Sequence, residues 1–202
     1  MQRDEFFWTS TINKATIVVN AAEGLLSNEA AREAAGGVAR LEAKAEKDPA
    51  LRVKSYIAYE PLLIAETSPA VTLIHAGRSS QDILRDRTVQ VAKAFDAVIG
   101  KLLDLAEANR HTIVPNYTNG VAAQPNSYAH YLLGITAAFL RDRERLNECL
   151  TRYNACAMGS TVLNGTGWPL NREAMAVRLG FPAPRRNAFD ATCMSPADMP
   201  FE

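Results

Sequence analysis

The segment at residues 74–83 (IHAGRSSQDI) places an arginine beside short oxygen-bearing side chains, just before a long helical pattern. Gly77 permits a tight turn, and Ser79, Ser80 and Asp82 can cap the following helix while its first amides stay exposed. Arg78 adds a forked donor at the positive end of the helix dipole, which is a natural place for a carboxylate. The alternative is a capped helix start with a solvated arginine, and spacing alone favours that simpler interpretation.

A second segment, residues 115–127 (PNYTNGVAAQPNS), is crowded with neutral hydrogen-bonding groups. It lies between two long helical patterns. Small hydroxyl and amide side chains of this kind could orient an anionic substrate, or they could only cap the two helices. The residue types leave both interpretations open.

A third segment, residues 157–169 (AMGSTVLNGTGWP), is rich in glycine. It lacks the preceding strand, the lysine and the spacing of a phosphate-binding loop. It precedes a short predicted helix from Asn171 to Leu179, which Gly180 and Pro182 end.

Two long helices must position the first two segments. Between Ile83 and about Glu107, apolar residues recur at alternating steps of four and three, which is the pattern of a helix packed against nearly parallel neighbours. A second helix carries a similar stripe and is expected to start at a cap on Asn126 or Ser127. The two stripes comprise Leu84, Val91, Phe95, Val98, Leu102 and Leu105, then Tyr128, Leu132, Ile135, Phe139, Leu146, Cys149 and Tyr153. Helices this long are typical of a bundle.

Shorter helices are expected before residue 80. One ends near Gly24, and Ser27 or Asn28 caps another that runs to the Asp48-Pro49 break. Residues 59–73 should hold one short helix, and no strand pattern is convincing. We predict an all-α fold, with an N-terminal helical domain at residues 1–80 and part of a central helical bundle at residues 81–202.

Composition limits the classes of partner. Lys plus Arg and Asp plus Glu both number 22, so no whole-chain field attracts nucleic acid or anionic lipid. No apolar run is long enough for a signal peptide or a membrane helix. Cys149, Cys156 and Cys193 have no metal-like spacing, which favours reduced thiols, and we expect a cytoplasmic protein.

The three segments together resemble the successive signatures of the argininosuccinate lyase, fumarase and aspartase superfamily. Residues 75–82 (HAGRSSQD) are similar to H-T-G-R-S-R-N-D, and residues 117–125 (YTNGVAAQP) are similar to Y-T-H-L-Q-R-A-Q-P. Residues 159–173, 179–181 and 186–190 resemble the G-x-G-A-L-A-G-T, I-D-R-E, L-G-F and R-N-S-L-D series, and residues 59–63 fall where the family has an acidic helix. The resemblance covers essentially the whole chain and follows the family's order.

The resemblance implies a homotetramer with active sites built from several subunits. Its members eliminate fumarate from a substituted succinate: a base removes a β-proton and the C–N bond breaks. The substrate-binding positions expected by resemblance include Arg78, Ser79 and Ser80, with Gln81 in the place of a substrate-binding asparagine. Thr118 and Gln124 match the threonine and glutamine of the second motif, and Asn119 is the third substrate-binding residue expected there. No cofactor and no metal are implied.

Asn119 is the main departure from the family motif, which has a histidine at this position that assists proton transfer. An amide does not exchange a proton near neutral pH, so no catalytic residue is assigned. Ala76, Ser80 and Gln81 also depart from the first motif. We therefore expect argininosuccinate or a related N-substituted aspartate as substrate. His75 matches a motif histidine, and we expect a structural role for His130.

The family's third signature, G-S-S-x-M-P-x-K-x-N, supplies its serine base and has no counterpart in residues 1–202. We therefore expect a partial chain that is inactive alone and associates as a homo-oligomer or with a complementary C-terminal chain. Two alternatives remain open. One is a shortened relative that acts as a binding or assembly module, and the other is a helical interaction protein similar to the family only in architecture.

Overall fold

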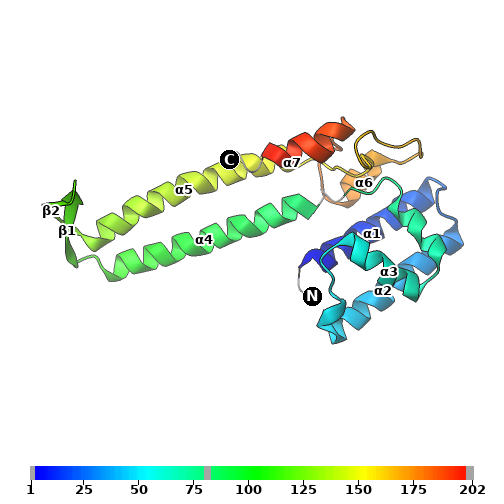
Figure 1. Cartoon of the computed structure of the whole chain (residues 1–202), viewed down its shortest axis with the longest axis horizontal. Helices are drawn as coiled ribbons and strands as arrows, with labels where there is room; N and C mark the ends of the chain where they lie inside the picture. Colours follow the sequence, from blue (N-terminus) through cyan, green and yellow to red (C-terminus); the bar gives the residue numbers. More distant parts are fainter. Residues whose placement is uncertain (1–2, 80–82, 199–202) are drawn as a thin grey trace. The chain divides into compact units, whose positions relative to one another are not determined.

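The structure is a computed structural model, in which residues 3–79 and 83–198 are described (Figure 1). Two compact units are present. Unit 1 combines Met1–Arg85 with Tyr153–Phe201, and unit 2 contains Asp86–Arg152. Residues after 152 therefore cluster with the N-terminal residues. The expected domains at residues 1–80 and 81–202 stay a prediction.

Three helices form the N-terminal part of unit 1: α1 (Glu5–Ala22), α2 (Asn28–Lys47) and α3 (Tyr56–Glu66). Short 3-10 segments follow α2 and α3, at η1 (Pro49–Leu51) and η2 (Pro69–His75). Side-chain oxygens of Asp4, Ser27 and Ser55 accept from first-turn amides and so define the three helix starts. The predicted cap at Ser27 is confirmed.

The core of unit 1 lies where α1, α2, α3 and η2 meet. Its largest side chain, Tyr59, is fully buried and packs its ring 5.2 Å from that of Phe6. Gly37 lets α2 approach α3 closely, because a Cβ there would lie 2.2 Å from Thr67 Cγ2. Buried members of this core are Phe6, Ile17, Leu26, Ala34, Val38, Leu41, Ala45, Tyr59, Leu63, Val71 and Ile74.

The C-terminal part of unit 1 contains α6 (Arg172–Arg178), the π-helical turn η4 (Asp190–Met194) and α7 (Ser195–Asp198). Asn171 caps α6, as its Oδ1 accepts from Ala174 N at 2.9 Å. A second apolar cluster joins this part to α1 through Ile12, Ala15, Val19, Cys156, Met158, Met175, Ala176 and Phe181. Residues from both ends of the chain therefore build one unit.

Unit 2 is a pair of long helices, α4 (Leu84–Ala108) and α5 (Tyr128–Tyr153), that lie side by side in Figure 1. Phe95 and Phe139 approach to 5.7 Å between ring centres, and Arg143 Nε lies 2.8 Å from Asp96 Oδ1. The predicted helices are confirmed, as is the predicted stripe on α5, whose members are buried or half-buried.

The predicted stripe on α4 is only partly correct. Its buried and half-buried positions recur at Thr88, Ala92, Phe95, Ile99, Leu102 and Ala106. Val91, Val98 and Leu105 were assigned to the same stripe, yet each remains 43–44% exposed. Alternating steps identify an apolar face but do not say which of two adjacent stripes packs within the chain.

A β-hairpin connects the two long helices, where we expected no strand. Strand β1 (Ile113–Thr118) pairs antiparallel with β2 (Val121–Ser127). The register joins Thr118 to Val121 and Pro115 to Pro125. The prediction was wrong because polar and proline residues hide the alternation, although Asn119-Gly120 between β-prone residues is a hairpin signal.

Within the described part of the chain, no helix combines the length and the apolar character needed to cross a membrane. In the same residues, no group of three or more His, Cys, Asp or Glu side chains could hold a metal ion. Cys149, Cys156 and Cys193 are free thiols.

Candidate functional site

The turn after η2 is held by close contact with the glycine-rich third segment. Gly77 has φ of 72°, and a Cβ added there would lie 2.1 Å from Leu170 Cδ1 and 3.2 Å from Gly159 Cα. Gly159 N donates to Gly77 O at 2.7 Å. Only glycine satisfies both the left-handed conformation and this approach. The third segment is therefore a structural support for the first.

Arg172 fixes the third segment in turn. Its guanidinium donates to Met158 O at 2.9 Å and Arg185 O at 2.6 Å. Gly159, with φ of 85°, allows this approach, because a Cβ there would lie 2.8 Å from the Arg172 side chain. The guanidinium donates to carbonyl groups of two separate stretches and so holds them together.

Arg78 contacts α1 within unit 1. Its Nη2 donates to Oδ1 of Asn13, a fully buried residue of α1. The positive charge also acts on His75 and Tyr59, which lie close by. The structure places this guanidinium against α1, and its expected role of holding a substrate carboxylate stays a prediction.

Ser79 is 5% exposed. Ser80 and Gln81, the other two predicted binding residues of this segment, lie outside the described residues.

The imidazole of His75 is half-buried and neutral at pH 7. Burial, and after it the positive charge of Arg78, lowers the pKa of His75 from 6.5 to about 4. Its Nε2 lies 3.7 Å from Glu60 Oε1, which is too long for a hydrogen bond. At neutral pH this approach is not an ion pair, since the imidazole carries no charge.

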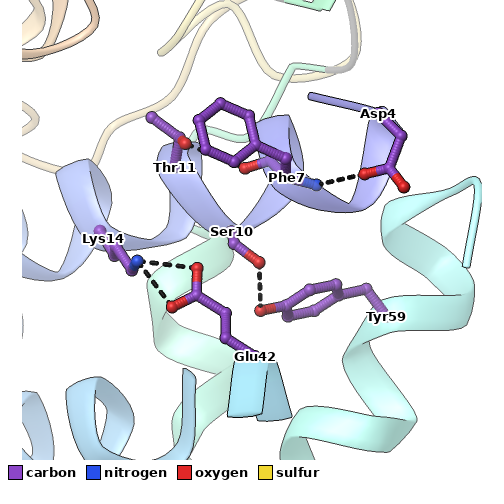
Figure 2. Close-up of polar contacts among 7 residues, drawn as sticks. All are labelled: Asp4, Phe7, Ser10, Thr11, Lys14, Glu42 and Tyr59. Carbon is purple, nitrogen blue, oxygen red and sulfur yellow. Dashed lines mark hydrogen bonds and ion pairs between the residues drawn. The ribbon is translucent and has the colours of Figure 1, made fainter. Parts of the chain in front are cut away.

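Helix α1 has a buried polar face, and this face includes Asn13, the residue that Arg78 contacts. Thr9, Asn13, Thr16 and Asn20 follow one another at steps of four, three and four, and each is at most 2% exposed. The adjacent Ser10 Oγ lies 2.9 Å from the Tyr59 hydroxyl, as Figure 2 shows. The sequence analysis did not identify this polar face, although its helical periodicity could have revealed it.

An ion pair connects α1 with α2, and a hydrogen bond connects α1 with α3. Lys14 Nζ lies 2.7 Å from both carboxylate oxygens of Glu42 (Figure 2). Burial raises the pKa of the Tyr59 hydroxyl, although hydrogen bonds with Ser10 and Asn13 oppose that shift. Among the described residues, neither side-chain atom of Asn20 finds a hydrogen-bond partner. The face is thus polar, buried and only partly satisfied by hydrogen bonds.

The second predicted binding segment is the hairpin of unit 2. Asn119 and Gly120 form its turn with φ of 48° and 77°, and positive values at both positions define a type I′ turn. Asn tolerates the left-handed region better than most residues. Asn119, which occupies the family's histidine position, therefore fits the backbone geometry of this turn.

Predicted binding residues Thr118 and Gln124 lie on one face of this hairpin. Strand β1 is regular, so Thr118 shares a face with Asn116, two residues earlier. Asn116 pairs with Gln124 across the ladder, and a register shift follows this pair. Thr118, Asn119 and Gln124 are all exposed. Arg78 and Ser79 belong to unit 1, so the prediction that the two segments meet stays a prediction.

Comparisons with known proteins show similarity to a family of lyases. The family model described as "Lyase" matches residues 12–198. The argininosuccinate lyase of Trichlorobacter lovleyi is 37% identical over 126 residues, covering 58% of this chain and 28% of that enzyme. An EDDS lyase variant with bound fumarate is 29% identical with a TM-score of 0.74, covering 93% of this chain and 39% of that chain. Class II fumarase from Schistosoma mansoni, at 15% identity and a TM-score of 0.70, shares the fold over 93% of this chain and 50% of that chain.

The chain belongs to this lyase family, and its mostly helical fold is that of the fumarase/aspartase superfamily. It spans about 30% of the length of the curated relatives that it matches.

Proposed function

We propose that this chain provides carboxylate-binding segments of a C–N lyase that releases fumarate from argininosuccinate or a related N-substituted aspartate. The observation that carries the proposal is the hairpin, which presents Thr118 and Gln124 on one exposed face. Both occupy substrate-binding positions of the matching family motif. The similarity to argininosuccinate lyases and to an EDDS lyase with bound fumarate supports the substrate class.

The proposed reaction is a β-elimination. A base removes a β-proton, the adjacent carboxylate takes up the charge as an aci-carboxylate, and the C–N bond breaks. Neutral donors such as the Thr118 hydroxyl and the Gln124 amide would stabilise the dianionic intermediate, provided that they are already oriented before it forms. We propose arginine biosynthesis as the pathway to which this step belongs.

We also propose a homotetramer in which long helices of neighbouring subunits pack together. Unit 2 leaves large apolar side chains exposed along both helices: Val91, Val98, Leu103, Leu105, Tyr131, Leu133 and Leu140. Beside them, Ala97, Val98, Lys101, Leu102 and Leu105 line an open depression of about 340 Å³. Apolar surface of this extent favours association. The free thiols fit the cytoplasm, which we propose as its location.

A second candidate function is a binding or assembly module without catalysis, which Asn119 favours. The family motif carries a proton-transferring histidine here, and an amide cannot replace that role near neutral pH.

Thermal shift of the full chain tests the binding common to both functions. We expect fumarate, argininosuccinate or adenylosuccinate to raise Tm, because a ligand that binds only the folded state stabilises it by about 2.7 kcal/mol at one hundred times its Kd. Acetate, with a single carboxylate, is the matched control and should leave Tm unchanged. If no dicarboxylate shifts Tm more than acetate does, both functions are rejected.

Fumarate release separates the two functions when the family's serine-bearing signature is supplied, because we expect this chain to be inactive alone. The appearance of fumarate in the ultraviolet from argininosuccinate or another aspartate adduct, after a complementary chain with the G-S-S-x-M-P-x-K-x-N signature is added, would support the lyase. Binding of the same compounds without fumarate release in that mixture would support the module.

A further inference from the structure

The hairpin carries two further amide side chains beside the predicted binding residues. Asn116 and Asn126 lie on the face that also holds Thr118 and Gln124, and we call these four residues the amide face. Asn126 Nδ2 donates to Asn116 Oδ1 at 3.2 Å. The sequence analysis treated this segment as a loop, named Asn126 only as a possible helix cap and did not single out Asn116.

The backbone fixes the direction of this hydrogen bond. Ser127 N donates to Asn126 Oδ1 at 2.9 Å, and a backbone N–H can only donate. The Asn126 oxygen therefore faces the backbone, and its amide nitrogen must face Asn116. Ser127 is itself held, since its Oγ accepts from His130 N at the start of α5. The orientation of Asn126 is thus set by the helix start.

Asn116 must consequently turn its oxygen toward Asn126 and its amide nitrogen along the amide face. Within residues 3–79 and 83–198, no group accepts a hydrogen bond from this nitrogen. Cross-strand neighbours such as Asn116 and Gln124 have Cβ atoms about 5 Å apart, and Thr118 is about 7 Å along the strand. The Asn116 N–H groups are therefore within reach of a ligand held by these two residues.

We propose that Asn116 is a further substrate-binding residue, whose amide nitrogen donates to a carboxylate of the bound dicarboxylic acid. Asn126 is a positioning residue that keeps this donor, rather than the carbonyl oxygen, toward the ligand. This inference rests on the proposed function, and it adds a pre-oriented donor to the two residues that the family motif identifies.

Titration calorimetry of fumarate into the full chain tests the inference. Asn116→Ala should raise Kd about tenfold or more, which is the usual effect of losing a hydrogen bond to a charged group. Asn116→Gln keeps the donor and should stay within about threefold of the parent Kd. Asn126→Ala frees the Asn116 amide to rotate, so its Kd should rise by an intermediate factor.

Ile113→Thr is the matched control, because Ile113 is exposed on the opposite face of the same strand and should leave Kd unchanged. All four variants should keep the ligand-free Tm of the parent, which separates loss of a donor from loss of the hairpin. If the parent binds fumarate and Asn116→Ala binds equally well, this inference is overturned and the proposed function stands. If the parent does not bind, both are overturned.

Discussion

At the scale of the single residue, position 119 is subject to two requirements, one from the turn conformation and one from the family's chemistry. A type I′ turn needs a positive φ, which Asn and Gly adopt at low cost, while the family chemistry needs a titratable group at the same position. The observed φ of 48° shows that the first demand is met. Histidine also tolerates this region better than most residues, so the absence of histidine here is not imposed by the turn.

The Arg78–Asn13 contact should contribute measurably to the stability of unit 1. Replacing Arg78 by Met leaves the fully buried Asn13 oxygen without its donor, so we expect the free energy of unfolding to fall by about 1–3 kcal/mol. Urea denaturation measures this change. The double variant Asn13→Leu/Arg78→Met should recover part of the loss, since both polar partners are then removed.

Arg32→Met is the control for this pair. Arg32 is exposed on α2, and its replacement should change stability by less than about 0.5 kcal/mol. Asn13→Leu is measured alone as well. If the losses of unfolding free energy in Asn13→Leu and Arg78→Met add up to the loss in the double variant, the two side chains are not coupled.

His75 should make stability depend on pH between about 4 and 6.5. Its folded pKa is depressed, so the unfolded chain binds more protons in this window. Stability is therefore full above pH 6.5 and is lost as pH falls toward 4, by an amount on the order of 3 kcal/mol. The charged groups nearest the ring are Glu60 and Arg78.

Urea denaturation at pH 7, 6 and 5 measures this dependence. His75→Gln removes the titrating group, so its stability should change less with pH than that of the parent over the same range. Equal slopes for the two proteins would show that other groups cause the pH dependence.

At the scale of the element, the sequence predicted helices well and the hairpin not at all. Periodicity found α4 and α5 because their apolar residues recur over many turns. It missed the hairpin because Pro115, Asn116 and Pro125 break the alternation of a strand, and only Asn119-Gly120 signals it. The inward direction of Arg78 could not be predicted, since it depends on Asn13, which is far away in the sequence.

Gly77 and Gly100 should respond in opposite ways to replacement by Ala. Gly77→Ala combines a strained φ of 72° with a contact of 2.1 Å to Leu170, so we expect a loss of more than about 2 kcal/mol. Gly100 lies inside α4 with no atom within 4 Å of a Cβ, and Gly100→Ala should stabilise by about 0.5–1 kcal/mol. Denaturant unfolding of both variants tests this, and a mild effect at Gly77 would mean that the turn and Leu170 can move apart.

At the scale of the whole molecule, the exposed stripe Val91–Val98–Leu105 should determine the oligomeric state. These residues repeat every seven positions on α4, which is the spacing of a helix seam. Val98→Glu places a charge in that seam, so we expect the oligomer to dissociate in size-exclusion chromatography with light scattering. Val18→Glu is matched in exposure, at 44%, and should leave the molar mass unchanged. An oligomer that survives Val98→Glu would exclude this stripe from the interface.

The pairing of Pro115 with Pro125 has a consequence for the two outer edges of the hairpin. Proline cannot donate to the ladder, so both residues fit only where the backbone nitrogens point outward, away from the partner strand. Each free edge therefore lacks one N–H near its middle. A two-stranded ribbon is otherwise a template for strand addition and aggregation. These prolines protect the exposed ribbon against such growth.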